Sequence, residues 1–129
     1  MAPNPPAEQP SLRVLIVDDN PDVLATLVPQ VQQLGHVAET ASDARAALER
    51  FQAGQFDAVI ADVMMPGING LELSRRLRAV DPAVRIIVVT GGAMDLEPGL
   101  AASGIEFLRK PFTRQMLAER LPPATVKPR

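Results

Sequence analysis

The sequence predicts an α/β fold, a doubly wound sheet of five parallel strands. Short apolar, β-branched segments with the pattern of buried strands alternate along the chain with segments in which apolar residues recur at helical spacing. Such alternation is typical of a parallel sheet with helices on both faces. Strands this apolar are expected to be covered on both sides. The length of 129 residues, with 47% hydrophobic and 22% charged content, fits one globular domain.

Each strand is predicted from a short apolar run. The expected strands lie at residues 12–17, 37–40, 57–61, 84–89 and 105–108. The first helix is expected to be capped by Asn20 and to end before Gly35, and Pro29 should kink its middle. We expect Ser42 to cap the second helix, which continues through Phe51.

The later helices differ in how strongly the sequence marks them. The third is expected from about Gly70 to Val80. Its candidate apolar face consists of Leu71, Leu73, Leu77 and Val80. Segment 91–104 contains Pro98 and Gly99, so the fourth helix should be short or irregular. The last helix should be capped by Thr113 and ended by a pair of prolines.

The two ends of the chain differ from its middle. Residues 1–10 hold four prolines and residues 122–129 hold three, without a periodic apolar pattern. We therefore expect two disordered proline-rich tails around one domain at residues 11–121, with no output domain attached.

Composition excludes several classes of site. Without Cys there are no disulfides and no thiolate chemistry, and one histidine cannot build a histidine metal centre. A net charge of −2 does not favour a nucleic acid partner, and no apolar stretch reaches the ~20 residues that span a membrane. We expect a cytoplasmic domain that binds neither nucleic acid nor membrane. His36 is expected at the surface or at a strand entry, with no functional role.

Polar groups follow four of the predicted strands. Asp18 and Asp19 end the first, Asp62 the third, Thr90 the fourth and Lys110 the fifth. Because the carboxyl ends of parallel strands meet at one edge of a sheet, these groups should converge there. Paired carboxylates at a strand end are a usual way to hold Mg²⁺, and an aspartate nucleophile needs a metal to offset phosphoryl charge.

Each of these residues also has an ordinary structural interpretation. The acidic pair could cap a helix, although Asn20 can do so instead. Asp62 could form a turn, Thr90 could satisfy a backbone group, and Lys110 could be a solvated surface lysine. No glycine-rich dinucleotide loop and no P-loop motif is present, which disfavours those modes of phosphate binding.

In their order along the chain, these residues resemble the response-regulator receiver domain of two-component signalling. The residues that carry the resemblance are Asp18-Asp19, Asp62, Met65-Pro66 with Gly70, Thr90, and Lys110-Pro111-Phe112. The resemblance covers roughly residues 12–121. It implies the flavodoxin-like strand order 2-1-3-4-5.

The resemblance also implies a role for each matched residue. Asp62 matches the phosphoacceptor. Asp18 and Asp19 match the acidic pair that binds Mg²⁺, helped by Asp62 itself and by the backbone carbonyl of Met64. Lys110 matches the lysine that contacts the phosphoryl group.

Two further residues match the family's switch. Thr90 matches the switch hydroxyl and Phe107 the switch aromatic, which lacks a phenolic hydroxyl here and would act by packing alone. The family has a cis peptide bond between Lys110 and Pro111.

The function expected is that of a Mg²⁺-dependent phosphoacceptor. A histidine kinase or histidine phosphotransfer protein would supply the phosphoryl group to Asp62, and a partner-binding face would switch. The domain would not be an enzyme, although it assists its own phosphorylation and dephosphorylation. One alternative is a receiver-fold interaction module that phosphate does not regulate. A second is a metal-dependent phosphatase, for which Val63 and Met64 supply no second acid.

Overall fold

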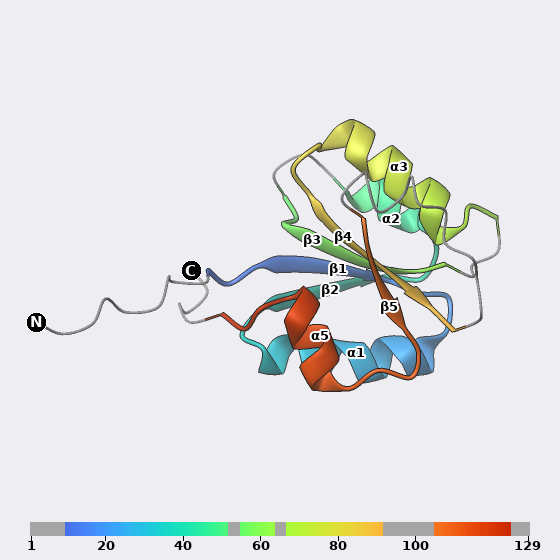
Figure 1. Cartoon of the computed structure of the whole chain (residues 1–129). Coiled ribbons are helices and arrows are strands. Elements are labelled where there is room, and N and C mark those ends of the chain that lie inside the picture. Colours follow the sequence, from blue (N-terminus) through green and yellow to red (C-terminus); the bar gives the residue numbers. More distant parts are fainter. Residues whose placement is uncertain (1–9, 52–54, 64–66, 92–104, 125–129) are drawn as a thin grey trace, which may run out of the picture.

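Five parallel strands form one sheet in the order β2-β1-β3-β4-β5, as the sequence predicted (Figure 1). The computed structural model describes residues 10–51, 55–63, 67–91 and 105–124. The strands are β1 (Arg13–Val17), β2 (Val37–Ala41), β3 (Ala58–Asp62), β4 (Arg85–Thr90) and β5 (Glu106–Arg109). Every strand boundary predicted from the sequence lies within one residue of the observed one.

Helices cover both faces of the sheet. They are α1 (Pro21–Gln33), α2 (Ala44–Arg50), α3 (Gly70–Val80) and α5 (Arg114–Arg120). Helices α2 and α3 lie on one face, and α1 and α5 lie on the other (Figure 1). The helix expected in segment 91–104 lies outside the described residues, except for Gly91. No described helix has the length and apolar character needed to cross a membrane.

Successive residues of β1 belong to two separate cores. Leu15 and Val17 pack toward α2 and α3, whereas Val14 and Ile16 pack toward α1 and α5. All four side chains are at most 1% exposed. Burying such a side chain contributes roughly 1.5–3 kcal/mol. Burial on both faces explains why the strand is continuously apolar rather than alternating.

The register of the sheet brings the carboxyl ends of its strands to one edge. Asp62 is paired with Val89, and Thr90 is paired with Arg109. The backbone N–H of Asp18 donates to the carbonyl of Ala41 at the end of β2 (3.2 Å). The polar residues at the carboxyl ends of these strands therefore lie side by side along one edge of the sheet.

Side-chain caps fix where the helices start. Asn20 accepts from the N–H of Asp22 (2.9 Å), as predicted. The prediction that Ser42 caps α2 was wrong by one residue. Asp43 is the cap, because its carboxylate accepts from the N–H of Ala46 at 2.7 Å. Such a cap stabilises a helix by about 1 kcal/mol.

The buried stripe of α3 differs from the predicted one. Leu73 and Leu77 are buried, but Val80 is 48% exposed at the last residue of the helix. Ser74 takes the remaining buried position, where its hydroxyl donates to the carbonyl of Gly70 (2.6 Å). Internal hydrogen bonding therefore allows a polar residue in the stripe.

His36 lies at the entry to β2, as expected, but not at the surface. Its side chain is 4% exposed. The ring lies between the backbone N–H of Leu12 and the backbone carbonyl of Pro122. Two backbone partners offset the cost of burying this polar ring.

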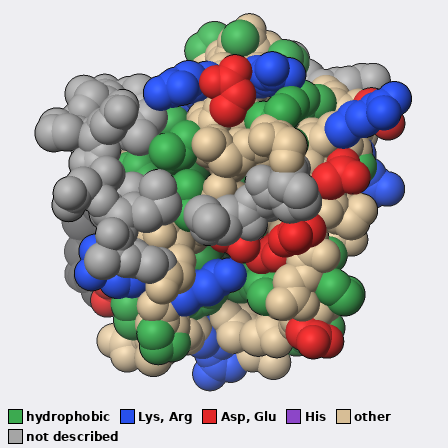
Figure 2. All heavy atoms as spheres, turned by 90° about the vertical axis from the view of Figure 1, so that its right-hand side faces the viewer, with side chains coloured by type: hydrophobic (Ala, Val, Ile, Leu, Met, Phe, Trp, Pro, Cys, Tyr) green, Lys and Arg blue, Asp and Glu red, His purple; other side chains and the backbone are tan. Residues whose placement is uncertain are grey.

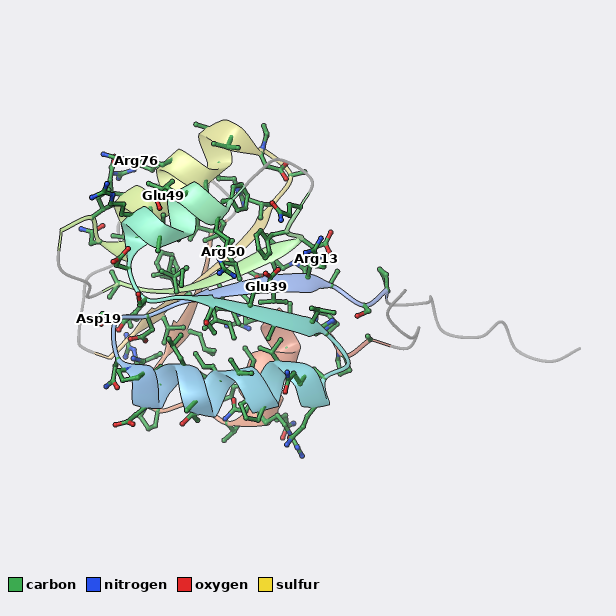
Figure 3. The ribbon with its side chains drawn as sticks, turned by 180° about the vertical axis from the view of Figure 1, so that it is seen from behind. Arg13, Asp19, Glu39, Glu49, Arg50 and Arg76 are labelled. Atoms are coloured by element: carbon green, nitrogen blue, oxygen red, sulfur yellow. The ribbon has the colours of Figure 1, made fainter. Side chains whose placement is uncertain are left out.

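Ion pairs tie α2 to the edge strand β2. Glu39 lies between Arg13 and Arg50, with both N···O distances 3.2 Å (Figure 3). Partly exposed pairs of this kind contribute about 0–1 kcal/mol each. Asp19 lies at the opposite end of the sheet in the same view.

Candidate functional site

Three carboxylates converge at the carboxyl edge of the sheet. Asp18, Asp19 and Asp62 each offer an oxygen within 4.8 Å of the others. Asp18 is buried, Asp62 half-buried and Asp19 exposed. Figure 2 views the molecule from this edge and shows acidic side chains gathered near its centre beside a basic group. The cluster thus reaches from a buried carboxylate to one that solvent can contact.

Lys110 brings one positive charge to the cluster. Its Nζ lies 3.5 Å from Asp62 Oδ2 and 3.9 Å from Asp18 Oδ2. The base of this side chain is held in place because the Lys110 N–H donates to the Thr90 carbonyl at 2.7 Å. One ammonium against three carboxylates leaves the cluster net negative.

The environment of Asp18 disfavours its ionised form. Burial raises the pKa of its carboxyl group above the usual value, and the charges of Asp62 and Asp19 raise it further. The N–H of Asn20, which donates to Asp18 Oδ1 at 2.9 Å, and the Lys110 ammonium act in the opposite direction. From the sequence, Asn20 was expected only to cap the helix. Its second contact is made by a backbone N–H, which residue type does not indicate.

The donor set fits a hard divalent cation. All of its ligand atoms are carboxylate oxygens, which Mg²⁺ and Ca²⁺ prefer, and they come together with excess negative charge. A cation there would relieve the repulsion that disfavours ionised Asp18. The carbonyl of Met64, which the sequence analysis added to this set, lies outside the described residues.

The Thr90 hydroxyl is buried without a hydrogen-bond partner among the described residues. Leaving such a group unsatisfied costs about 1–3 kcal/mol. Thr90 follows Val88 by two residues and so belongs to the same face of the sheet. Val88 is paired with Phe107, and both pack in the core toward α2 and α3. The two predicted switch residues are therefore diagonal neighbours on adjacent strands.

A cavity of about 650 Å³ opens beside the cluster, between α1 and the loop after β5. Its lining consists of Asp22, Val23, Thr26, Leu27, Gln30, Gly91, Lys110, Pro111 and Phe112. The Gln30 Oε1 atom is buried without a hydrogen-bond partner among the residues described. No sequence pattern indicates this cavity, because it arises from the spacing between two elements far apart in the chain.

Gly70 permits α3 to begin directly against the end of β3. A Cβ atom at this position would come within 2.9 Å of the Asp62 carbonyl carbon and 3.0 Å of Val63 Cα, and still closer to the Asp62 carbonyl oxygen. These atoms belong to backbone and cannot rotate away. Gly70 belongs to the motif that carries the resemblance, and this close approach is the physical reason for a glycine there.

Comparisons with known proteins agree with this geometry. The family model of the response regulator receiver domain matches residues 14–122. The transcriptional regulatory protein TcrA of Mycobacterium tuberculosis (strain ATCC 25618 / H37Rv) is 37% identical over 112 residues, covering 85% of this chain and 44% of TcrA. The chain spans about half the length of the curated relatives it matches.

Solved structures give the same result. The response regulator protein TrrA of Thermotoga maritima in complex with Mg²⁺-BeF matches with a TM-score of 0.77 and 32% identity, covering 84% of this chain and 95% of that chain. A structure of the histidine kinase ThkA in complex with TrrA matches with a TM-score of 0.75 and 32% identity, covering 84% and 94%.

The chain therefore belongs to the response regulator receiver domain family of two-component signalling. Receiver domains are phosphoacceptor signalling modules, and the cluster of Asp18, Asp19 and Asp62 is typical of their Mg²⁺ site.

The first prediction concerns repulsion within the cluster. Because the pKa of Asp18 is raised in the fold, its ionisation lowers stability as pH rises above the unfolded value of about 3.9. Without Mg²⁺, Asp18→Asn should therefore increase the free energy of unfolding at pH 7, and the gain should vanish in acid. Added Mg²⁺ should stabilise the wild type but not the variant. Urea unfolding at pH 7 and in acid, with and without Mg²⁺, measures the free energy of unfolding of each protein. Asp22→Asn, on the exposed first turn of α1, is the control, and an equal gain there would contradict the assignment.

The second prediction concerns Gly70. Gly70→Ala should destabilise the domain by roughly 1–3 kcal/mol through overpacking, although alanine is the better helix former. It should also weaken Mg²⁺ binding, because the displaced backbone carries Asp62. Calorimetric Mg²⁺ titration of Gly70→Ala and Gly67→Ala separates displacement of the Asp62 backbone from backbone strain in general. Gly67 has a φ of +78° and open space around it, so its variant is strained without touching β3. Equal Mg²⁺ affinity in both variants would argue against this role.

Proposed function

We propose that this chain is a Mg²⁺-dependent phosphoacceptor in which Asp62 receives a phosphoryl group from a phosphohistidine. The donor would be a histidine kinase or a histidine phosphotransfer protein. The observation that carries the proposal is the contact of Lys110 with Asp62 inside a cluster of three carboxylates. An acceptor, a set of cation ligands and a fixed positive charge are what phosphoryl transfer requires. We assign this unit to residues 11–121.

The chain's own residues account for the transfer. A carboxylate oxygen of Asp62 attacks phosphorus as the phosphorus–nitrogen bond of the donor breaks, and the electron pair leaves with the imidazole. Lys110, already 3.5 Å from Asp62, offsets charge on the phosphoryl oxygens without reorganising, which is the main way a protein assists this reaction. Asp18, Asp19, Asp62 and the Met64 carbonyl would hold Mg²⁺, which when bound supplies neutralisation of phosphoryl charge. The same groups would assist attack by water, and so the domain's own dephosphorylation.

The buried Thr90 hydroxyl supports a switch that follows transfer. This donor has no partner among the described residues, and phosphorylation would offer it an acceptor oxygen, so turning toward the phosphoryl group would gain a hydrogen bond. Phe107, diagonal to Thr90 on the same face, would repack into the space that is vacated. The new charge thus shifts the population between two side-chain arrangements.

The cavity beside Lys110 is where we expect the phosphohistidine donor to bind. Its lining includes Lys110, the residue whose ammonium contacts Asp62, so a protein seated there would lie next to the cluster. Its apolar residues on α1 can pack against a partner helix. The histidine kinase in the TrrA complex is a partner of the class that we propose.

Asp62→Asn should abolish phosphorylation by acetyl phosphate in Mg²⁺, because the amide oxygen is a far weaker nucleophile than the carboxylate. Intact-mass spectrometry measures the added phosphoryl group. Asp57→Asn is the matched control, since Asp57 directly precedes β3, away from the cluster, and accepts from the Arg13 N–H. Loss of labelling in both variants would indicate a general structural effect. Undiminished labelling of Asp62→Asn would exclude Asp62 as the acceptor. No labelling of the wild type would instead favour a receiver fold that phosphate does not regulate.

Lys110→Ala should still accept some phosphoryl group but lose the conformational response. The lysine backbone is bonded to Thr90 and its side chain to Asp62, so it links the acceptor to the switch. Amide chemical-shift changes around Thr90 and Phe107 on addition of beryllofluoride and Mg²⁺ report the response. Arg109→Ala, exposed on β5, serves as the control. A response of wild-type size in Lys110→Ala would refute the coupling.

A further inference from the structure

The buried His36 ring joins the two ends of the described fold. The Leu12 N–H donates to His36 Nδ1 (3.0 Å), and His36 Nε2 lies 2.8 Å from the Pro122 carbonyl oxygen. A carbonyl only accepts, so Nε2 must carry a proton, and Nδ1 must lack one in order to accept from Leu12. Both contacts therefore require one tautomer of the neutral ring.

Other contacts gather around the same turn between α1 and β2. Ala124 donates its N–H to the Leu34 carbonyl (2.7 Å), and the Ser11 hydroxyl donates to the Gly35 carbonyl (2.8 Å). Gly35, with φ +89°, lies so close to Ala124 that a Cβ on the glycine would be 2.9 Å from the alanine Cβ. The turn is thus a docking surface for the chain that follows α5.

From this geometry we propose that His36 is a proton-operated latch for segment 122–124. The neutral ring holds the segment against the α1–β2 turn, and protonation of Nδ1 releases it. The latch lies at the amino edge of the sheet, opposite the carboxylate cluster (Figure 1).

Protonation opposes the closed arrangement for two reasons. A proton on Nδ1 would face the Leu12 N–H, placing two donors against each other. The resulting cation would also be buried, since His36 is 4% exposed. Accordingly, burial lowers the pKa of His36 below its usual value. The Pro122 carbonyl opposes this shift because it accepts from the ring.

The charged groups around the ring do not reverse this preference. Arg85 on β4 lowers the pKa of His36 further, and Asp57 raises it by the smallest contribution. Arg13 on β1 is paired with Glu39, and Arg120 on α5 donates to the Phe107 carbonyl. The last turn of α1 and segment 122–124 have no titratable side chain. The folded pKa thus lies below the unfolded value of about 6.5, so the latch stabilises the fold above that pH and loses its contribution below it.

The opening should be confined to the segment itself. Leu121 is fully buried and its N–H donates to the Leu117 carbonyl (2.8 Å), which anchors the end of α5. Pro122 and Pro123 have no N–H to contribute. Among the described residues, the hydrogen bonds of the segment are those to His36 and to Leu34.

The single histidine makes the test direct. In ¹⁵N-labelled protein, the ring nitrogen shifts give the tautomer and pKa of His36, and amide hydrogen exchange reports Ala124 and Leu12. The neutral tautomer protonated at Nε2 should dominate at about pH 8. Below about pH 6.5, protection of Ala124, corrected for intrinsic exchange, should fall up to about tenfold per pH unit until the folded pKa is reached. Residues 14–17 should stay protected. A ring that titrates at or above the usual value, unchanged Ala124 protection, or simultaneous loss of protection in β1 would each overturn the latch.

Two variants test whether the proton on His36 is responsible. In His36→Gln the amide cannot titrate, so the protection of Ala124 should no longer depend on pH. Ala124→Pro removes the N–H that bonds to Leu34 and leaves the ring intact. Releasing the segment in this way should move the pKa of His36 toward its ordinary value, since the coupling is reciprocal. An undiminished pH dependence in His36→Gln, or an unchanged ring pKa in Ala124→Pro, would overturn the proposal.

Discussion

The site depends on the burial of the central strands on both of their faces. A strand covered by helices on either side has no interior position at which a charge is tolerated, so polar side chains are confined to its ends. Parallel register then brings those ends to one edge. The same constraint that makes the strands apolar thereby concentrates Asp18, Asp62 and Lys110 in one place.

That concentration is costly without a ligand. Burial and neighbouring charges disfavour ionised Asp18, and the Thr90 hydroxyl lacks a partner among the described residues. Under the proposed function, both costs would fall when a cation and a phosphoryl group bind. Unsatisfied groups raise the free energy of the resting state, and relieving them contributes to the free energy of the response. The close packing of Gly70 against β3 keeps the arrangement from relaxing.

Features that depend on residue type could be predicted from the sequence. Features that depend on backbone geometry, or on contacts between residues far apart in the chain, could not. Strand ends followed from apolar runs, and the cluster followed from the strand ends. Ser42 and Asp43 are both good caps, and only backbone geometry decides between them. Val80 matched the helical period, but α3 ends there. The burial of His36 was not predicted, because its hydrogen-bond partners are backbone atoms of residues far away in the chain. The cavity beside Lys110 likewise depends on how α1 sits relative to a distant loop.

One feature of the His36 contact bears on how such a domain can be built into larger proteins. Leu12 and Pro122 are hydrogen-bonded to the two nitrogens of a single imidazole, so the start and the end of the fold are separated by one ring and two hydrogen bonds. Both lie at the edge away from the carboxylate cluster. A domain whose ends meet in this way can be inserted into a loop of a host protein without spreading that loop, and its order can be circularly permuted. Its acidic edge stays accessible in either arrangement.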